Sequence, residues 1–131
     1  MNPGVDEIKE WLQKARNDLL SARILMEHEP PVSDTAAFHS QQAVEKTLKA
    51  FLVWKGVRFE KVHSLTYLLD LFEAEEAGFA SLRERAEALA PFAVEIRYPG
   101  EATEVSREEA RDAFATAEAV WNSVLNLLPS E

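Results

Sequence analysis

A stripe of polar side chains in segment 33–55 is the part of this sequence whose spacing could support chemistry. Its members follow one another at steps of three and four residues, so a helix would place them on one face: His39, Gln42, Lys46, Lys49 and Val53. In this stretch only Glu45 precedes a lysine by four residues, the arrangement typical of a solvated face. The stripe therefore suggests a polar groove for an anion. The alternative is a solvated or dimer-facing helix surface.

The distribution of charge supports a localised anion site. The chain carries a net charge of −9, which disfavours non-specific nucleic-acid binding because phosphate contacts depend on Lys and Arg. From residue 43 to residue 63, however, five basic side chains outnumber two acids, whereas residues 70–95 hold seven acids and two arginines. One basic zone on an acidic molecule is a candidate anion site. Alternatively, these lysines only solubilise the end of a helix.

Most common catalytic motifs are absent. The chain has no cysteine, which excludes a disulfide framework, a thiolate nucleophile and a Cys-ligated zinc site. It also lacks a Gly-rich phosphate loop, G-x-S-x-G and H-E-x-x-H. Glu60 and His63 form a single E-x-x-H, but di-iron bundles need two such motifs and two further glutamates. We therefore expect no metal, no cofactor and no assignable catalytic residue.

The bulk properties predict one domain spanning residues 1–131, with 47% hydrophobic residues available for a core. The N-terminal residues are polar and acidic, without the apolar run of a signal peptide. No apolar stretch of about 18 residues could cross a membrane. These features predict a cytoplasmic protein with no membrane association.

Apolar residues recur with a helical period along nearly the whole chain. They predict a first helix ended by Pro30 and Pro31, and a second that Ser33 or Asp34 caps and Gly56 stops. A short third helix is predicted to start at His63 or Ser64 and to break at Gly78. A fourth is predicted over 80–97, with a kink or split at Pro91, and a last one starts at the capping box of Ser106 and Glu109. The fold class is thus all-α: an up-and-down four-helix bundle with an additional short helix.

Several segments resemble the HEPN family. The run AAFHSQQAVEKTLKAFL at 36–52 resembles the signature of that family's second helix. The family's first helix resembles the residues Trp11, Ala15, Asp18, Leu19 and Ala22. Its loop and the start of its third helix resemble Gly56, Phe59, Lys61, His63 and Leu65, and the motif before its last helix resembles Arg97, Tyr98 and Pro99.

The resemblance implies a helical bundle that dimerises. It also implies a function in nucleotide or RNA handling, since many members act in toxin–antitoxin pairs with a minimal nucleotidyltransferase and others cleave RNA. The RNA-cleaving members carry an arginine and, after about four to six intervening residues, a histidine, which suits phosphoryl charge stabilisation and proton transfer. Here Arg97 is not followed by such a histidine, because Ala102, Thr103 and Glu104 occupy the required positions. Arg58 and His63 have the right spacing but precede the third helix, so we interpret that spacing as coincidence.

From these patterns we expect a HEPN homodimer that has lost the RNase motif. It would bind a nucleotide or RNA, or a nucleotidyltransferase partner that does so. The expected anion-binding residues are Lys46, Lys49, His63, Arg97 and Tyr98. Two alternatives remain: an RNA-cleaving toxin that uses Arg97 with another base, and a purely protein-binding helical module. Individual residues could instead be structural, with His63 capping a helix, Tyr98 packing and Arg97 pairing with Glu45.

Overall fold

A computed structural model describes residues 3–61, 64–94 and 104–129, and these residues form five α-helices and one 3₁₀ turn, with no strand. Three helices are long: α1 (Pro3–Glu27), α2 (Ser33–Lys55) and α5 (Arg107–Leu127). Two are short, α3 (Leu65–Glu75) and α4 (Ala80–Glu87), and the turn η1 (Ala90–Ala93) follows them. The prediction of an all-α bundle is confirmed.

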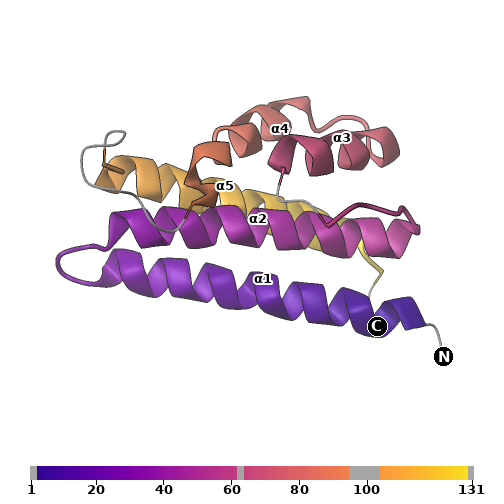
Figure 1. Ribbon diagram of the computed structural model, residues 1–131, viewed down its shortest axis with the longest axis horizontal. Coiled ribbons are helices and arrows are strands. Elements are labelled where there is room, and N and C mark those ends of the chain that lie inside the picture. The colour runs from indigo at the N-terminus through magenta and orange to yellow at the C-terminus, as the bar shows by residue number, and fades with distance from the viewer. Residues whose placement is uncertain (1–2, 62–63, 95–103, 130–131) are drawn as a thin grey trace.

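Helix α2 lies at the centre of the bundle. It runs alongside α1 for most of its length and also packs against α5, α3 and η1 (Figure 1). Helix α4 rests on α5, and α1 meets α5 much less closely than it meets α2. Because α2 has neighbours on several sides, more than half of its residues are buried, including Gln41, Val44 and Leu48.

The core fills the space between α2, α3, α4 and α5. Phe51 is fully buried, and its ring meets those of Phe72 and Trp54 edge to face, with the centroids 4.7 and 5.7 Å apart. Around these rings lie aliphatic side chains from four helices, among them Leu48, Leu52, Leu68, Leu69, Ala86, Ala113, Val120 and Val124. On α3 the buried side chains are Leu65, Leu68, Leu69 and Phe72.

Local signals set several helix boundaries as predicted. Gly56 ends α2 with φ 71°, a left-handed conformation that glycine adopts without a steric penalty. The Ser64 hydroxyl accepts a hydrogen bond from the Tyr67 N–H and so caps α3. Ser106 and Glu109 form the predicted capping box of α5, each side chain accepting from the other's backbone N–H at 3.0 Å.

One local prediction is wrong, and another is confirmed only in its split around Pro91. Neither Ser33 nor Asp34 caps α2, because Val32 occupies the cap position and no side chain bonds there. The Asp34 carboxylate instead accepts the backbone N–H of Val105 at 3.2 Å, which ties α2 to the start of α5. The expected fourth helix over 80–97 ends at Glu87 and gives way to the turn η1, which contains Pro91. The remainder of that range, 95–97, lies outside the described residues.

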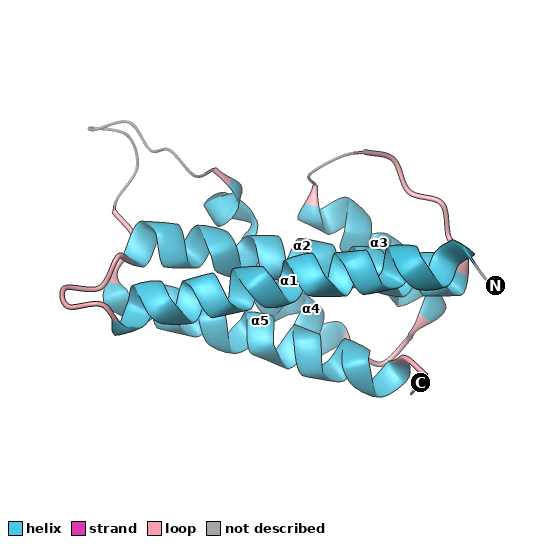
Figure 2. Cartoon of the chain, turned by 90° about the horizontal axis from the view of Figure 1, so that it is seen from below, coloured by secondary structure: helices cyan, strands magenta, loops and turns pink. Residues whose placement is uncertain are grey.

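Along the described segments, no helix is both long and apolar enough to cross a bilayer. The view from below shows the short loop between α1 and α2 at one end of the bundle (Figure 2). A tight link joins α1 to α2, where the backbone N–H of Val32 bonds to the carbonyl of Leu25 at 3.0 Å. The short α3–α4 unit and η1 lie beyond the other end of α2 in sequence and fold back onto it.

Candidate functional site

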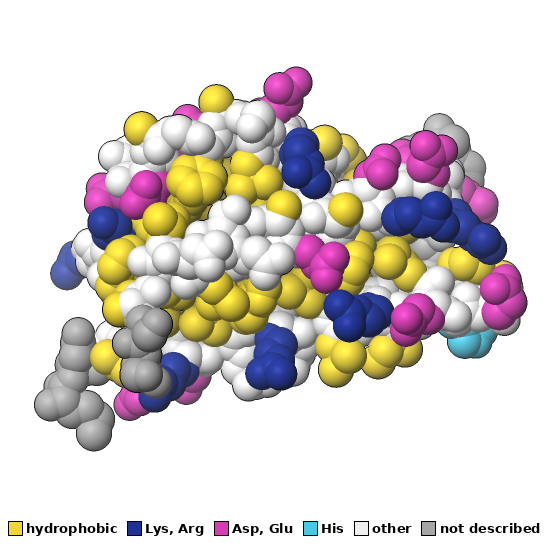
Figure 3. All heavy atoms as spheres, turned by 180° about the vertical axis from the view of Figure 1, so that it is seen from behind, with side chains coloured by type: hydrophobic (Ala, Val, Ile, Leu, Met, Phe, Trp, Pro, Cys, Tyr) yellow, Lys and Arg dark blue, Asp and Glu magenta, His cyan; other side chains and the backbone are white. Residues whose placement is uncertain are grey.

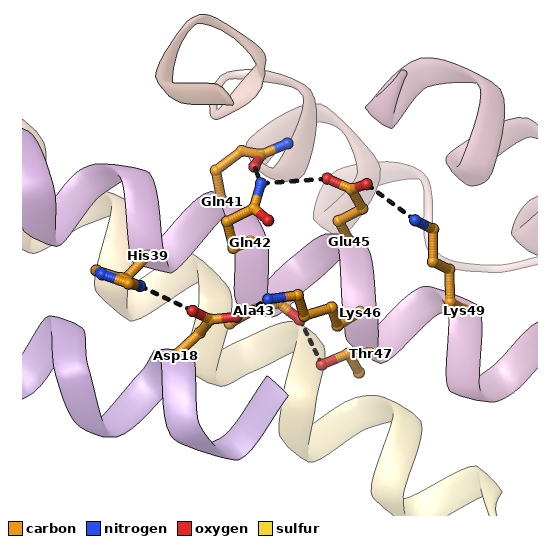
Figure 4. Close-up of polar contacts among 9 residues, drawn as sticks. All are labelled: Asp18, His39, Gln41, Gln42, Ala43, Glu45, Lys46, Thr47 and Lys49. Carbon is orange, nitrogen blue, oxygen red and sulfur yellow. Dashed lines mark hydrogen bonds and ion pairs between the residues drawn. The ribbon is translucent and has the colours of Figure 1, made fainter. Parts of the chain in front are cut away.

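Asp18 of α1 organises one half of the polar stripe on α2. Its Oδ1 accepts a hydrogen bond from His39 Nδ1 at 2.7 Å, and its Oδ2 lies 2.6 Å from Lys46 Nζ (Figure 4). Asp18 itself is buried, whereas the side chains of His39 and Lys46 are 25% and 24% exposed. A single carboxylate of α1 therefore holds two members of the predicted stripe.

Glu45 organises the other half. Its Oε1 receives the Lys49 ammonium at 3.0 Å, and its Oε2 lies 3.4 Å from Gln42 Nε2 (Figure 4). Lys49 is buried, with only 9% of its side chain exposed, and its ammonium stands 5.0 Å from the centroid of the Trp11 ring. This ion pair and cation–π contact enclose a charged group in a low-dielectric environment, where electrostatic interactions are stronger than in water.

The amide of Gln41 ends this chain of hydrogen bonds. Gln42 Nε2 donates to Gln41 Oε1 at 2.7 Å, and because the Glu45 carboxylate can only accept, it fixes the direction of both amides. The Nε2 group of Gln41 is consequently left as a buried donor, and it has no partner in the described part of the chain. Buried donors without partners are rare in folded proteins, and each calls for a physical explanation.

We name these residues the α2 polar cluster: Asp18, His39, Gln41, Gln42, Glu45, Lys46 and Lys49. Both lysines predicted to bind an anion belong to it, and each already contacts a carboxylate. The positive charges of Lys46 and Lys49 are balanced by the carboxylates of Asp18 and Glu45. An incoming anion would therefore not meet two free ammonium groups. It would compete with Asp18 for Lys46, which is the more exposed of the two lysines.

Three predicted site residues, His63, Arg97 and Tyr98, lie outside the described residues. The alternative pairing of Arg97 with Glu45 and the E-x-x-H motif that ends at His63 each include one of them, so these two predictions also lie outside the described residues. The described neighbours of these positions are Ser64, at the start of α3, and Val94, which follows η1. Both α3 and η1 pack on α2, the helix that carries most of the cluster. Among the described side chains, no three His, Asp or Glu residues are grouped closely enough to hold a metal ion.

Sequence reasoning placed Asp18 in the first helix but assigned it no part in the site. A signal was present, because Asp18 lies three residues after Ala15 and four before Ala22, both of which belong to the buried stripe of α1. A carboxylate on a buried stripe requires a charged or hydrogen-bonding partner. Its partners, His39 and Lys46, come from another helix, and their pairing depends on how the helices are arranged.

The sequence model of the HEPN domain matches residues 8–127. The chain belongs to the HEPN domain family. The match extends from early in α1 to the last residue of α5, so it includes every helix and the whole α2 polar cluster.

Three known proteins are similar to this chain in sequence or in fold. The chain is 27% identical to a protein of Methanocaldococcus jannaschii named putative toxin MJ1304, over 92% of this chain and 87% of that protein. Its fold resembles that of TT1696 from Thermus thermophilus, with a TM-score of 0.80 and 26% identity over 92% of this chain and 98% of the other. It also resembles ST0689, an archaeal HEPN homologue, with a TM-score of 0.74 and 23% identity over 92% and 96% of the two chains.

Proposed function

We propose that this HEPN protein is one subunit of a toxin–antitoxin-type pair that acts with a nucleotidyltransferase, and that it binds a nucleotide or a short RNA at the α2 polar cluster. The similarity to a protein named as a putative toxin supports the first part. The proposed nucleotide or RNA binding rests on one observation, the Asp18–Lys46 ion pair. This pair joins α1 to α2 on the more exposed side of a buried network of charged side chains.

Stability alone does not account for such a network. Buried ion pairs recover little more than the cost of removing their charges from water, and well-packed apolar residues in their place are often as stable or more so. Gln41 adds a buried donor without a partner among the described residues. Buried ionisable groups with specific charge partners are enriched at functional sites. We infer that a phosphate would exchange with Asp18 at Lys46, while Lys49 and Gln41 would offer a second charge and a neutral donor.

Calorimetry with AMP and with a short oligoadenylate at low salt tests this proposal. We expect binding that weakens as salt rises, by about one unit of log–log slope for each phosphate contact. The double variant Lys46→Ala, Lys49→Ala should lose binding. Asp18→Asn should strengthen it by about fivefold, because a partly exposed ion pair that competes with the ligand contributes on the order of 1 kcal/mol.

Two further variants make the binding test specific. Gln41→Leu should weaken binding but leave the free energy of unfolding within about 1 kcal/mol of the native value. It removes a buried donor that has no partner among the described residues, and Gln42, which loses Gln41 as an acceptor, keeps its contact with Glu45. Arg107→Ala should change nothing, since Arg107 is an exposed cation whose only described ion pair is a long one to Glu29, at 3.7 Å. Binding that persists in the double lysine variant would show the stripe to be only a helix surface.

The expected partner suggests a separate test. A nucleotidyltransferase encoded beside this HEPN protein should co-purify with it as a complex of fixed stoichiometry. If no such gene is adjacent and the chain still binds oligoadenylate, the paired-subunit part of the proposal fails while the binding part stands.

RNA cleavage is expected to be weak or absent, because no histidine follows Arg97 at the family spacing. The purified protein should leave structured and unstructured RNA intact, with or without divalent metal, in a gel-based cleavage assay. Robust cleavage that disappears in Arg97→Ala would instead support the RNA-cleaving alternative.

A further inference from the structure

Helices α1 and α5 leave a long groove between them on the face opposite to that of Figure 1. Toward its middle the groove holds a hollow of about 600 Å³, lined by Leu20 and Trp121 among others. It continues past Leu125 into a second hollow of about 520 Å³, which Trp54 and Leu12 help to line. Figure 3 shows hydrophobic side chains gathered along this seam, with basic side chains beside them.

The apolar lining of the groove is open to solvent. Leu20 on α1 is 55% exposed and Leu125 on α5 is 37% exposed, and Ile24, which lies one turn beyond Leu20 and outside the lining of the hollows, is 57% exposed. These three are a majority of the large hydrophobic side chains that are exposed in the described residues. Single exposed leucines are ordinary, but apolar side chains that line one continuous groove are typical of an interaction surface.

The polar lining of the groove is mainly basic. Arg16 and Arg23 lie on its α1 side and Glu118 on its α5 side, and Arg23 bridges to Glu118 at 3.3 Å. Arg16 is exposed and has no ion-pair partner in the described part of the chain. A groove with a surplus of positive charge is unusual on a chain whose net charge is −9. It is complementary to an acidic partner and would repel a basic one.

The shape of the groove argues against a second copy of this chain as its occupant. A two-fold dimer presents the same surface on both subunits, so two hollows would face each other and leave unfilled space. It would also bring two sets of arginines together. A single helix, about 10 Å across, fits a trough between two helices, and apolar side chains at steps of three and four residues would enter the hollows.

We propose that the α1/α5 groove binds an amphipathic, acidic helix of a partner protein. Along α1 the groove extends from Arg23 back to Gly4, which corresponds to about 29 Å of helix. A partner helix of about 20 residues would match that length. Its apolar stripe would cover Leu20, Trp121 and Leu125, and its carboxylates would pair with Arg16 and Arg23.

Designed peptides of about 20 residues test the proposal without a known partner. One carries leucines at helical spacing flanked by glutamates, a second has lysines in place of the glutamates, and a third is a scramble of the first. Fluorescence anisotropy at low salt should show the acidic peptide binding at least about tenfold more tightly than the other two, a difference that falls as salt rises.

Charge reversal and apolar variants complete the test. Arg16→Glu should reduce the preference for the acidic peptide by about tenfold, while Arg111→Glu, an exposed arginine of α5 outside the groove, should leave it unchanged. The double variant Leu20→Asp, Leu125→Asp should abolish binding without altering the circular dichroism spectrum. Equal affinity for all three peptides would overturn the proposal. A fall from dimer to monomer mass in the double variant would also overturn the proposal, because it would show that a second copy of this chain binds in the groove.

Discussion

The ion pair of Glu45 and Lys49 is the most buried charge pair described in this HEPN protein. Both side chains are almost fully enclosed, and Lys49 also stands over the Trp11 ring. Removing one member of a buried pair leaves the other without a counter-charge, which costs far more than loss of a solvent-exposed pair. The stability of the molecule should therefore depend strongly on Glu45, although the pair as a whole contributes little net free energy.

Glu45→Gln keeps the shape of the side chain and removes its charge. We expect it to lower the free energy of unfolding by about 3 kcal/mol, measured by urea denaturation followed by circular dichroism. The matched control is Glu118→Gln, in the exposed pair with Arg23, which should change stability by no more than about 0.5 kcal/mol. Equal effects of the two substitutions would mean that water screens Glu45 and Lys49 as effectively as a surface pair.

At the scale of the elements, the capping box of α5 is the clearest local signal in the chain. Ser106→Ala removes the side chain that accepts the Glu109 N–H at 3.0 Å, and should cost about 1 kcal/mol in urea denaturation. Ser33→Ala is a suitable control, because Ser33 begins α2 without a side-chain cap bond and should be nearly neutral. A comparable loss in both variants would contradict the assignment of Val32 as the cap of α2.

These elements also show what the sequence could and could not predict. Helical periodicity and the signals at Gly56, Ser64 and Ser106 are local, so the helices and most of their ends were predictable. The split of the fourth helix around Pro91 was predictable as well, but the end of α4 at Glu87 was not, because the effect of Pro91 reaches backward: its missing N–H leaves the preceding turn without a helical bond, and the chain adopts a 3₁₀ turn instead. Asp34 was misassigned for a different reason, since its partner Val105 is 71 residues away.

The α2 polar cluster was likewise predictable from the sequence only in part. The spacing of Lys46 and Lys49 placed both on α2 beside Glu45, and the i, i+4 pair of Glu45 with Lys49 followed from the sequence. The partnership of Lys46 with Asp18 did not, because it depends on the register of α1 against α2. Spacing predicts which residues share a helix face, but only packing determines which charges of neighbouring helices neutralise one another.

At the scale of the whole molecule, the three tryptophans show how thin this bundle is. Trp11, Trp54 and Trp121 are all only partly buried, and they lie on α1, α2 and α5. Trp121 faces the α1/α5 groove and Trp54 lines its far end, whereas Trp11 packs under the Lys49 ammonium of the α2 polar cluster. Two surfaces with partly exposed aromatic side chains therefore flank α1, one made with α5 and one with α2.

We expect two copies of this HEPN protein to associate through a surface other than the groove, and light scattering at tens of micromolar should give twice the chain mass of 14.8 kDa. A stable interface would bury roughly 1,000 Å² or more. The variant Leu20→Asp, Leu125→Asp should keep the dimer mass, because it changes only the groove. A monomer mass for the native chain at these concentrations would contradict the dimer.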